Sequence, residues 1–169
     1  MLNIVLIEPE IPQNVGNIAR SCVGFNTTLH LIKPYGFFFD INKNKQLSRS
    51  GCDYWKDLKY IEYDSFDDFL EKNNSEKNRF YYITRYGIKN PDEANMKTKE
   101  EVYVIFGKES VGINKDILIK NKENTIRIPS SDNVRSLNLS NCVAILAYEY
   151  LRQNKYEGLC LKEPHKPIF

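Results

Sequence analysis

The sequence has no long hydrophobic run and few residues of the types that bind metals. No apolar stretch approaches the roughly 20 residues that a helix needs to cross a membrane, and residues 1–8 lack a basic leader and a small-residue cleavage site. Only 2 histidines and 4 cysteines occur, and the cysteines form no C-x-x-C pair or zinc-type spacing. We therefore expect a cytoplasmic protein with no membrane contact and no metal site. Its cysteines are expected to be free thiols, with Cys22 and Cys142 in the core.

Signatures of several common enzyme classes are also missing. The segment 107–112 reads GKESVG, but Lys and Ser or Thr do not follow its second glycine, as a Walker phosphate loop requires. No G-x-G-x-x-G follows the first apolar segment, and no G-x-S-x-G elbow occurs. These absences argue against a P-loop nucleotidase, a Rossmann dinucleotide enzyme and a serine hydrolase.

The charge balance does not identify a partner. Lys and Arg number 24 and Asp and Glu number 22, which gives a formal net charge of +2. That value is far from the basic excess of many nucleic-acid-binding domains, although net charge says nothing about how the charges are distributed. Lys33, Arg49 and Lys108 are either candidate phosphate contacts or ordinary solvated charges.

Apolar runs and helical stripes alternate along the chain. We expect strands at 2–8, 28–32, 58–63, 80–84, 102–106 and 125–128, and helices at 14–25, 47–54, 65–72, 114–120 and 139–153. This alternation predicts an α/β fold, with a mainly parallel sheet covered by helices on both faces. Residues 1–157 are expected to form a single domain. Residues 158–169, which contain a glycine and two prolines, are expected to form an irregular tail.

Three polar segments each follow a predicted strand, and ligands gather at the carboxyl ends of strands in open α/β folds. The first, EPEIPQNVGNIAR, carries Asn14, Asn17 and Arg20. Gly16 within its helical pattern costs roughly 1 kcal/mol relative to alanine, which suggests a close approach to the backbone. Taken alone, this segment also fits an ordinary capped helix with a solvated arginine.

The other two polar segments are IFGKESVGI and IRIPSSDNVRSLNLSN. Gly107 and Gly112 flank an acidic residue, and Gly107 can let backbone amides approach a ligand, or the glycines can simply form a tight turn before a helix. Ser136, Asn138 and Ser140 are each suitable N-caps for the longest helix, and capping needs only one of them. The remaining polar groups are therefore available for a binding site.

In this order, EPEIPQNVGNIAR, FGKESVG and IPSSDNVRSLNLSN resemble the three signature motifs of the SPOUT class of RNA methyltransferases. The resemblance is strongest to the small tRNA wobble-nucleotide 2′-O-methyltransferases, the TrmL or YibK-like branch, and spans residues 1–157. It implies a C-terminal trefoil knot and S-adenosylmethionine bound in the knotted loops. It also implies a homodimer that is joined through the first and last helices.

The resemblance further implies roles for individual residues. The positions that match the cofactor site are Ile83, Gly107, Glu109, Gly112, Ile128, Ser136, Leu137 and Leu139. Arg20 matches a catalytic arginine that faces the cofactor of the other subunit, and Asn138 and Ser140 are secondary catalytic candidates. Asn14, Asn17 and Arg20 are expected to contact the substrate.

The activity that the resemblance implies is transfer of a methyl group to the ribose 2′-hydroxyl of nucleotide 34 of tRNA. This nucleotide is a cytidine or modified uridine, leucine isoacceptors are the expected substrates, and the anticodon stem-loop is the expected RNA partner. Two alternatives stay open. The same chemistry could act on ribosomal RNA or another tRNA position, because fold and cofactor do not fix the substrate. The chain could also be a noncatalytic RNA-binding protein that retains the fold.

Overall fold

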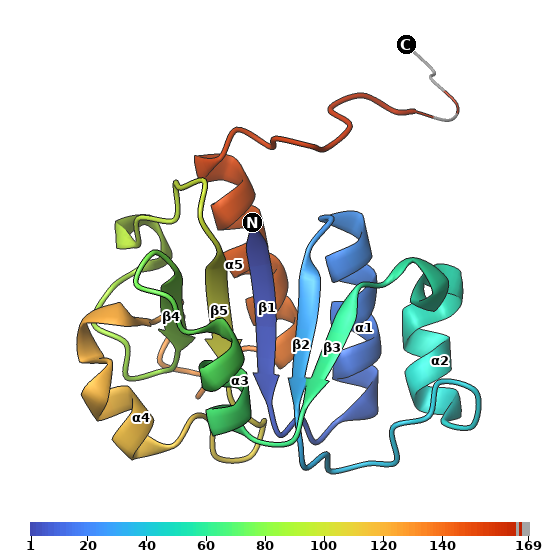
Figure 1. The fold of residues 1–169 in the computed structure, drawn as a ribbon, viewed down its shortest axis with the longest axis horizontal. Helices are drawn as coiled ribbons and strands as arrows, with labels where there is room; N and C mark the ends of the chain where they lie inside the picture. Colours follow the sequence, from blue (N-terminus) through green and yellow to red (C-terminus); the bar gives the residue numbers. More distant parts are fainter. Residues whose placement is uncertain (165, 167–169) are drawn as a thin grey trace.

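A six-stranded parallel sheet forms the centre of the molecule, in the strand order β3-β2-β1-β5-β4-β6 (Figure 1). The computed structural model describes residues 1–164 and 166. The strands are β1 Leu2–Ile7, β2 Thr28–Ile32, β3 Tyr60–Tyr63, β4 Arg79–Ile83, β5 Val102–Phe106 and β6 Thr125–Ile126. From β1 the chain first adds β2 and β3 on one side, and β4, β5 and β6 then form the other side of the sheet. The switch point between β1 and β5 is therefore a place where open α/β sheets form ligand sites.

Helices cover both faces of this sheet (Figure 1). The α-helices are α1 Pro12–Gly24, α2 Lys45–Gly51, α3 Phe66–Asn73, α4 Lys115–Lys120 and α5 Leu139–Gln153. The short 3-10 helices are η1 Cys52–Asp57, η2 Pro91–Glu93 and η3 Lys122–Asn124. Helices α1, α2 and α5 share one hydrophobic core with the sheet, and α3 and α4 share the other. The predicted α/β architecture is confirmed.

The alternation of side chains along β1 supplies both cores. Ile4 and Leu6 belong to the core of α1 and α5, whereas Val5 belongs to the core of α3 and α4. All three are at most 1% exposed. Successive side chains of a strand point to opposite faces, so a continuous apolar run is what a central strand covered on both faces requires.

Several element boundaries differ from the prediction by one or two residues, including those of β1, α1 and β3. The predicted strand 125–128 is only Thr125–Ile126, because its partner β4 ends at Ile83, which pairs with Ile126, and the chain then turns at residues 84–87. The predicted helix 47–54 begins two residues earlier as α2 and continues as the 3-10 helix η1. Ser65, the first residue of the predicted helix 65–72, is the N-cap of α3, since its hydroxyl accepts a hydrogen bond from the N–H of Asp68 at 3.1 Å.

Strand β6 is enclosed on two sides. β4 pairs with it on one side, and residues 84–89 run along the other, where the N–H of Lys89 donates to Thr125 O at 3.2 Å. A Cβ atom at Gly87 would lie 2.2 Å from the carbonyl carbon of Ile126, so this segment touches the strand backbone. After β6 the chain moves from the face of α4 to the face of α5. It does so between β4 and residues 84–89.

The described cysteines are free thiols, as predicted. Cys22 is buried and Cys142 is half-buried, and burial raises the pKa of the Cys22 thiol to about 12. The side chain of Cys52 lies outside the described ones. Residues 158–164 of the predicted tail form neither helix nor strand, and residues 165 and 167–169 lie outside the described chain. Within the described residues, no helix is long and apolar enough to cross a membrane.

His30 is a polar residue in the middle of β2 and is only 2% exposed. Its Nε2 lies 3.0 Å from Asn3 Oδ1, and its Nδ1 lies 2.8 Å from the Tyr63 hydroxyl. The Asn3 amide is oriented by donating to the carboxylate of Glu101 at 2.7 Å, so its oxygen faces the histidine. In the neutral ring, Nε2 therefore carries the proton and donates to Asn3, and Nδ1 accepts from the Tyr63 hydroxyl. Burial lowers the pKa of His30 to about 4.

This buried histidine predicts a pH-dependent loss of stability. A histidine in the unfolded chain has a pKa of about 6.5, so between this value and about 4 the unfolded state binds a proton that the folded state does not. We expect the wild-type protein to lose about 2–3 kcal/mol relative to His30→Gln when the pH falls from 7 to 4.5. Urea unfolding of both proteins at the two pH values measures this difference. Parallel loss of stability in the two proteins would contradict the assignment.

Candidate functional site

The three polar segments meet at the carboxyl edge of the sheet. The carboxylate of Glu109 accepts hydrogen bonds from Asn14 Nδ2 and from the N–H of Glu10, both at 2.9 Å. Asn138 Nδ2 donates to Asn14 Oδ1 at 3.0 Å, and Asn138 Oδ1 accepts from the N–H of Ser140 at 2.9 Å. One continuous chain of hydrogen bonds, here called the Glu109 chain, therefore links all three segments.

The carboxylate sets the direction of every bond in the Glu109 chain. A carboxylate only accepts, so Asn14 must turn its amide nitrogen toward Glu109 and its oxygen toward Asn138. Asn138 must then donate with its nitrogen, which leaves its oxygen free to cap α5. Asn14 is only 4% exposed, so an unmatched amide there would carry the desolvation cost of a buried polar group, about 1–3 kcal/mol.

Two further contacts hold the first segment against the second. The Glu10 carboxylate accepts hydrogen bonds from the N–H and from the hydroxyl of Ser110, both at 2.8 Å. The Lys108 ammonium pairs with the Glu8 carboxylate, which raises the pKa of the lysine. Lys33 similarly lies 3.0 Å from the carboxylate of Asp64. Both lysines, considered above as phosphate contacts, are thus already paired with acids.

The loop after β5 is folded tightly upon itself. The N–H of Gly112 donates to the carbonyl of Lys108 at 2.9 Å, and Gly112 has a φ of 77°, a left-handed conformation that favours glycine. A Cβ atom at Gly107 would lie 2.2 Å from both Gly112 C and Ile113 N. Only glycine at position 107 allows the two ends of this loop to touch.

This edge of the sheet contains a cavity of about 500 Å³. All eight residues that the sequence suggested for a cofactor line it: Ile83, Gly107, Glu109, Gly112, Ile128, Ser136, Leu137 and Leu139. Asn14 and Asn138 line it too. The walls are apolar where β4 and β5 end and where the third segment begins α5. The polar backbone of residues 107–112 forms another side. That these residues bind a cofactor stays a prediction, but the structure brings them together.

The other predicted site residues lie outside the cavity lining. Arg20 is six residues beyond Asn14, about 9 Å farther along α1. It is exposed, and its guanidinium carbon lies 5.2 Å from the centre of the Tyr54 ring. Asn17 is also exposed. The Ser140 hydroxyl donates to Asn138 Oδ1 at 2.7 Å, so it supports the cap of α5.

Sequence reasoning missed a group of residues at the mouth of the cavity. They are Arg85, Tyr86, Lys115, Arg127 and Arg135. Arg85 and Tyr86 follow the end of β4 closely, and Arg127 directly follows β6. The rule that ligands gather at the carboxyl ends of strands would have indicated these three, had it been applied to every strand.

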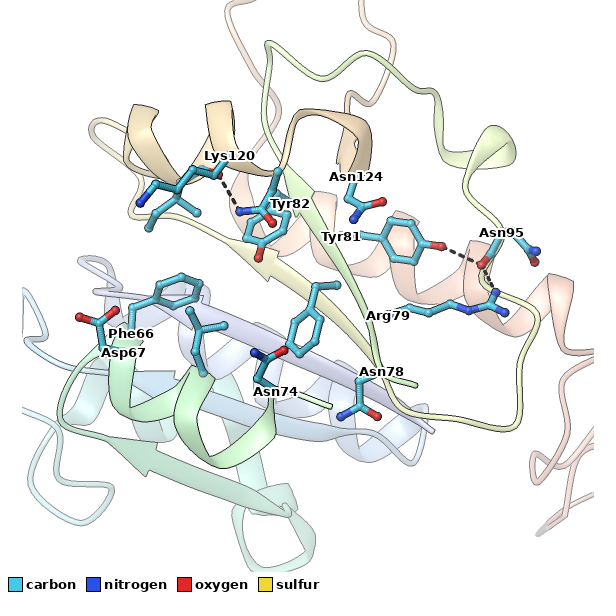
Figure 2. A pocket seen from close by; sticks show the side chains of 14 residues that line it. Phe66, Asp67, Asn74, Asn78, Arg79, Tyr81, Tyr82, Asn95, Lys120 and Asn124 are labelled. Carbon is cyan, nitrogen blue, oxygen red and sulfur yellow. Dashed lines mark hydrogen bonds between the residues drawn. The ribbon is translucent and has the colours of Figure 1, made fainter. Parts of the chain in front are cut away.

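A second hollow, of about 770 Å³, lies over β4 between α3 and α4 (Figure 2). Its polar side chains mainly fasten the surrounding chain. Tyr81 Oη and Arg79 Nη1 both donate to the carbonyl of Asn95, at 2.7 and 2.5 Å, and Asn121 Nδ2 donates to Ile117 O at 2.8 Å. Among the described residues, no group of three or more His, Cys, Asp or Glu could hold a metal ion. The carboxyl-edge cavity is therefore the candidate site.

The tight loop after β5 predicts an asymmetry between two glycine substitutions. Gly107→Ala forces backbone atoms apart and should lower the free energy of unfolding by about 1–3 kcal/mol or more. The matched control is Gly24→Ala at the end of α1, where nothing lies within 4 Å of the added carbon. That change should be neutral or stabilising by up to about 1 kcal/mol. Urea unfolding tests both, and equal stability of the two variants would contradict the contact at Gly107.

The chain matches the model of the SpoU rRNA Methylase family over residues 1–148. A protein of Listeria monocytogenes, provisionally named a tRNA (cytidine(34)-2′-O)-methyltransferase, is 49% identical over 164 residues, which are 96% of this chain and 94% of that protein. The crystal structure of a provisionally named RNA methyltransferase from Bacillus anthracis is similar with a TM-score of 0.87 at 44% identity, covering 96% of this chain and 100% of that one. A structure described as giving insights into the 2-OH methylation of C/U34 on tRNA matches with a TM-score of 0.83 at 38% identity, covering 92% and 97%. The chain therefore belongs to the SpoU methylase family.

Proposed function

We propose that the protein transfers a methyl group from S-adenosylmethionine to the ribose 2′-hydroxyl of nucleotide 34 of tRNA, a cytidine or modified uridine. The observation that carries this proposal is the Glu109 chain, which joins three separate segments around one cavity beside the switch point of the sheet. The provisional name of the relative that is 49% identical supports nucleotide 34 as the target. We expect the enzyme to act in the cytoplasm on leucine isoacceptors.

The cavity fits an adenosyl group in size and in chemistry. Its Ile and Leu side chains can flank a planar base, while the backbone of residues 107–112 can hydrogen-bond to its edge. The bound cofactor supplies a methyl group that its sulfonium charge already activates. Both carboxylate oxygens of Glu109 are occupied, one by Asn14 and one by the N–H of Glu10. We therefore assign Glu109 to organising the site.

Arg20 is our candidate for orienting the RNA. A guanidinium is a cation that only donates hydrogen bonds, so we assign it to gripping a phosphate and orienting the 2′-hydroxyl, not to accepting a proton. Its planar fork suits phosphate oxygens. Arg20→Lys with near-normal rates at neutral pH would argue against a need for the fork. Asn138 and Ser140 contribute by holding the start of α5 beside the cavity.

We propose that the protein forms a homodimer whose interface is made by α1 and α5. In this dimer, Arg20 of one subunit reaches the cavity of its partner. Two observations support this assignment. Arg20 lies outside the lining of the cavity in its own chain. On α5, Ile145 is 40% and Tyr148 is 53% exposed, which leaves apolar surface for a partner.

We also propose that residues 1–157 form a single domain that is closed by a trefoil knot. The support is the enclosure of β6 between β4 and residues 84–89, followed by the passage of the chain to the face of α5. A chain that passes between β4 and the loop of residues 84–89, and then continues as the 15-residue helix α5, is threaded through that loop. The knot brings the third polar segment back to the ends of β4 and β5.

The direct test is methylation of unmodified RNA. The purified protein is incubated with labelled S-adenosylmethionine and separate pools of tRNA and ribosomal RNA, and the methylated nucleotide is mapped by mass spectrometry. We expect label at the ribose of nucleotide 34 in leucine tRNAs, and at least a tenfold loss of rate in Arg20→Ala. Label only in ribosomal RNA would overturn the substrate and keep the chemistry. Cofactor binding without label in either pool would favour a noncatalytic RNA-binding protein.

Subunit mixing tests whether the active site is shared. Arg20→Ala removes the arginine, and Ile128→Arg blocks the cavity, so each homodimer should be inactive. A mixed dimer has one site with an intact cavity and an intact Arg20 only if the arginine acts across the interface. Random mixing in equal amounts should therefore restore about a quarter of the wild-type rate, since half the dimers are mixed and each has one complete site. An inactive mixture, with mixed dimers shown by tagged pull-down, would place Arg20 at the cavity of its own subunit.

A further inference from the structure

The mouth of the cavity carries unpaired positive charge. Arg85, Lys115, Arg127 and Arg135 line it and are exposed, and none of the four makes an ion pair within the described chain. Glu109 is the acidic residue of the lining, and its carboxylate is already bonded. The near-neutral chain, with a formal net charge of +2, thus concentrates cations around one opening. Such a surface is complementary to a polyanion.

An exposed aromatic ring lies among these cations. Tyr86 is 61% exposed, and the guanidinium carbon of Arg85 lies 4.6 Å from the centre of its ring. Arg85 also donates a hydrogen bond to the Tyr86 hydroxyl. The guanidinium covers part of the ring, and the remainder faces solvent. An aromatic ring beside an arginine is a surface on which unpaired nucleobases stack.

The backbone under Tyr86 is held rigidly. Residues 84–87 form a turn, in which the N–H of Gly87 donates to Thr84 O at 3.1 Å and the N–H of Tyr86 lies 3.3 Å from Thr84 Oγ1. Gly87 touches the backbone of β6, and Arg127 Nη1 donates to the carbonyl of Arg85 at 2.9 Å. A ring on such a fixed turn loses little freedom on binding, which favours affinity.

From these contacts we propose that the Arg85–Tyr86 turn, with Arg127, Arg135 and Lys115 around it, is the docking surface for the single-stranded RNA beside the methylated ribose. Tyr86 stacks on an unpaired base, and the cations contact the flanking phosphates. This inference rests on the proposed function for the identity of the RNA. It adds the residues that recognise the RNA. None of them belongs to the cofactor residues that the three motifs indicated.

Stacking and charge leave different signatures in a binding experiment. The dissociation constant of a fluorescent, unmodified anticodon stem-loop RNA is measured by anisotropy over a series of salt concentrations. Tyr86→Ala should weaken binding about 5- to 100-fold and leave the salt dependence unchanged, and Tyr86→Phe should bind like the wild type. Arg135→Gln should lower the slope of log affinity against log salt by about 0.7–1.

Two controls separate this surface from the rest of the molecule. Lys120→Gln removes one positive charge at the second hollow and should change neither affinity nor slope. Calorimetric titration with S-adenosylmethionine should give the same dissociation constant for all variants. Unchanged RNA binding by Tyr86→Ala, or a loss of cofactor affinity in its place, would overturn the docking surface. Tyr86-dependent RNA binding by a wild-type protein that methylates no RNA would overturn the proposed function alone.

Discussion

The Glu109 carboxylate is the constraint on which the candidate site depends. It comes from the loop after β5, yet it fixes an amide in α1 and, through Asn14, the cap of α5. Because a carboxylate cannot donate, one acidic residue determines which way two asparagines point. Three segments far apart in the sequence therefore share one geometry. The cavity between them exists only while all three are held together.

The topology of the sheet explains why these segments can meet. A parallel sheet places the ends of β1, β4 and β5 at one edge, so the loops that follow them are neighbours. The third segment reaches the same edge because β6 lies beside β4 and residues 84–89 close over it. The same wrapping presents Arg85 and Tyr86 at the cavity mouth. The enclosure of β6 and the proposed RNA docking surface thus use one short stretch of chain.

The sequence predicted most of this fold, because local patterns specify local structure. The apolar run of β1 and the helix that begins after Ser65 depend on neighbouring residues and could be predicted to within one residue. The hydrogen bond from Asn138 to Asn14 spans 124 positions. The rule on strand ends and the resemblance of the motifs placed the two segments at one site, but neither specified this contact. The ending of β6 at Ile126 depends on where its distant partner β4 ends, at Ile83, which no periodicity within residues 125–128 records. The exposed position of Arg20 likewise depends on which face of α1 it occupies in the fold, and the motif alone does not specify that face.

The most direct test of the central claim is the cofactor affinity of Glu109→Gln, measured by calorimetry. The substituted side-chain amide has one donor nitrogen, whereas the N–H of Glu10 and the Nδ2 of Asn14 both need an acceptor. The new amide nitrogen must either face the N–H of Glu10, which is also a donor, or make the side-chain amides of Asn14 and Asn138 flip. The flip of Asn138 would remove the cap from the N–H of Ser140. We predict a folded protein with at least about tenfold weaker binding of S-adenosylmethionine, and normal binding by the exposed control Glu123→Gln. Unchanged affinity in Glu109→Gln would show that the Glu109 chain does not organise the cavity.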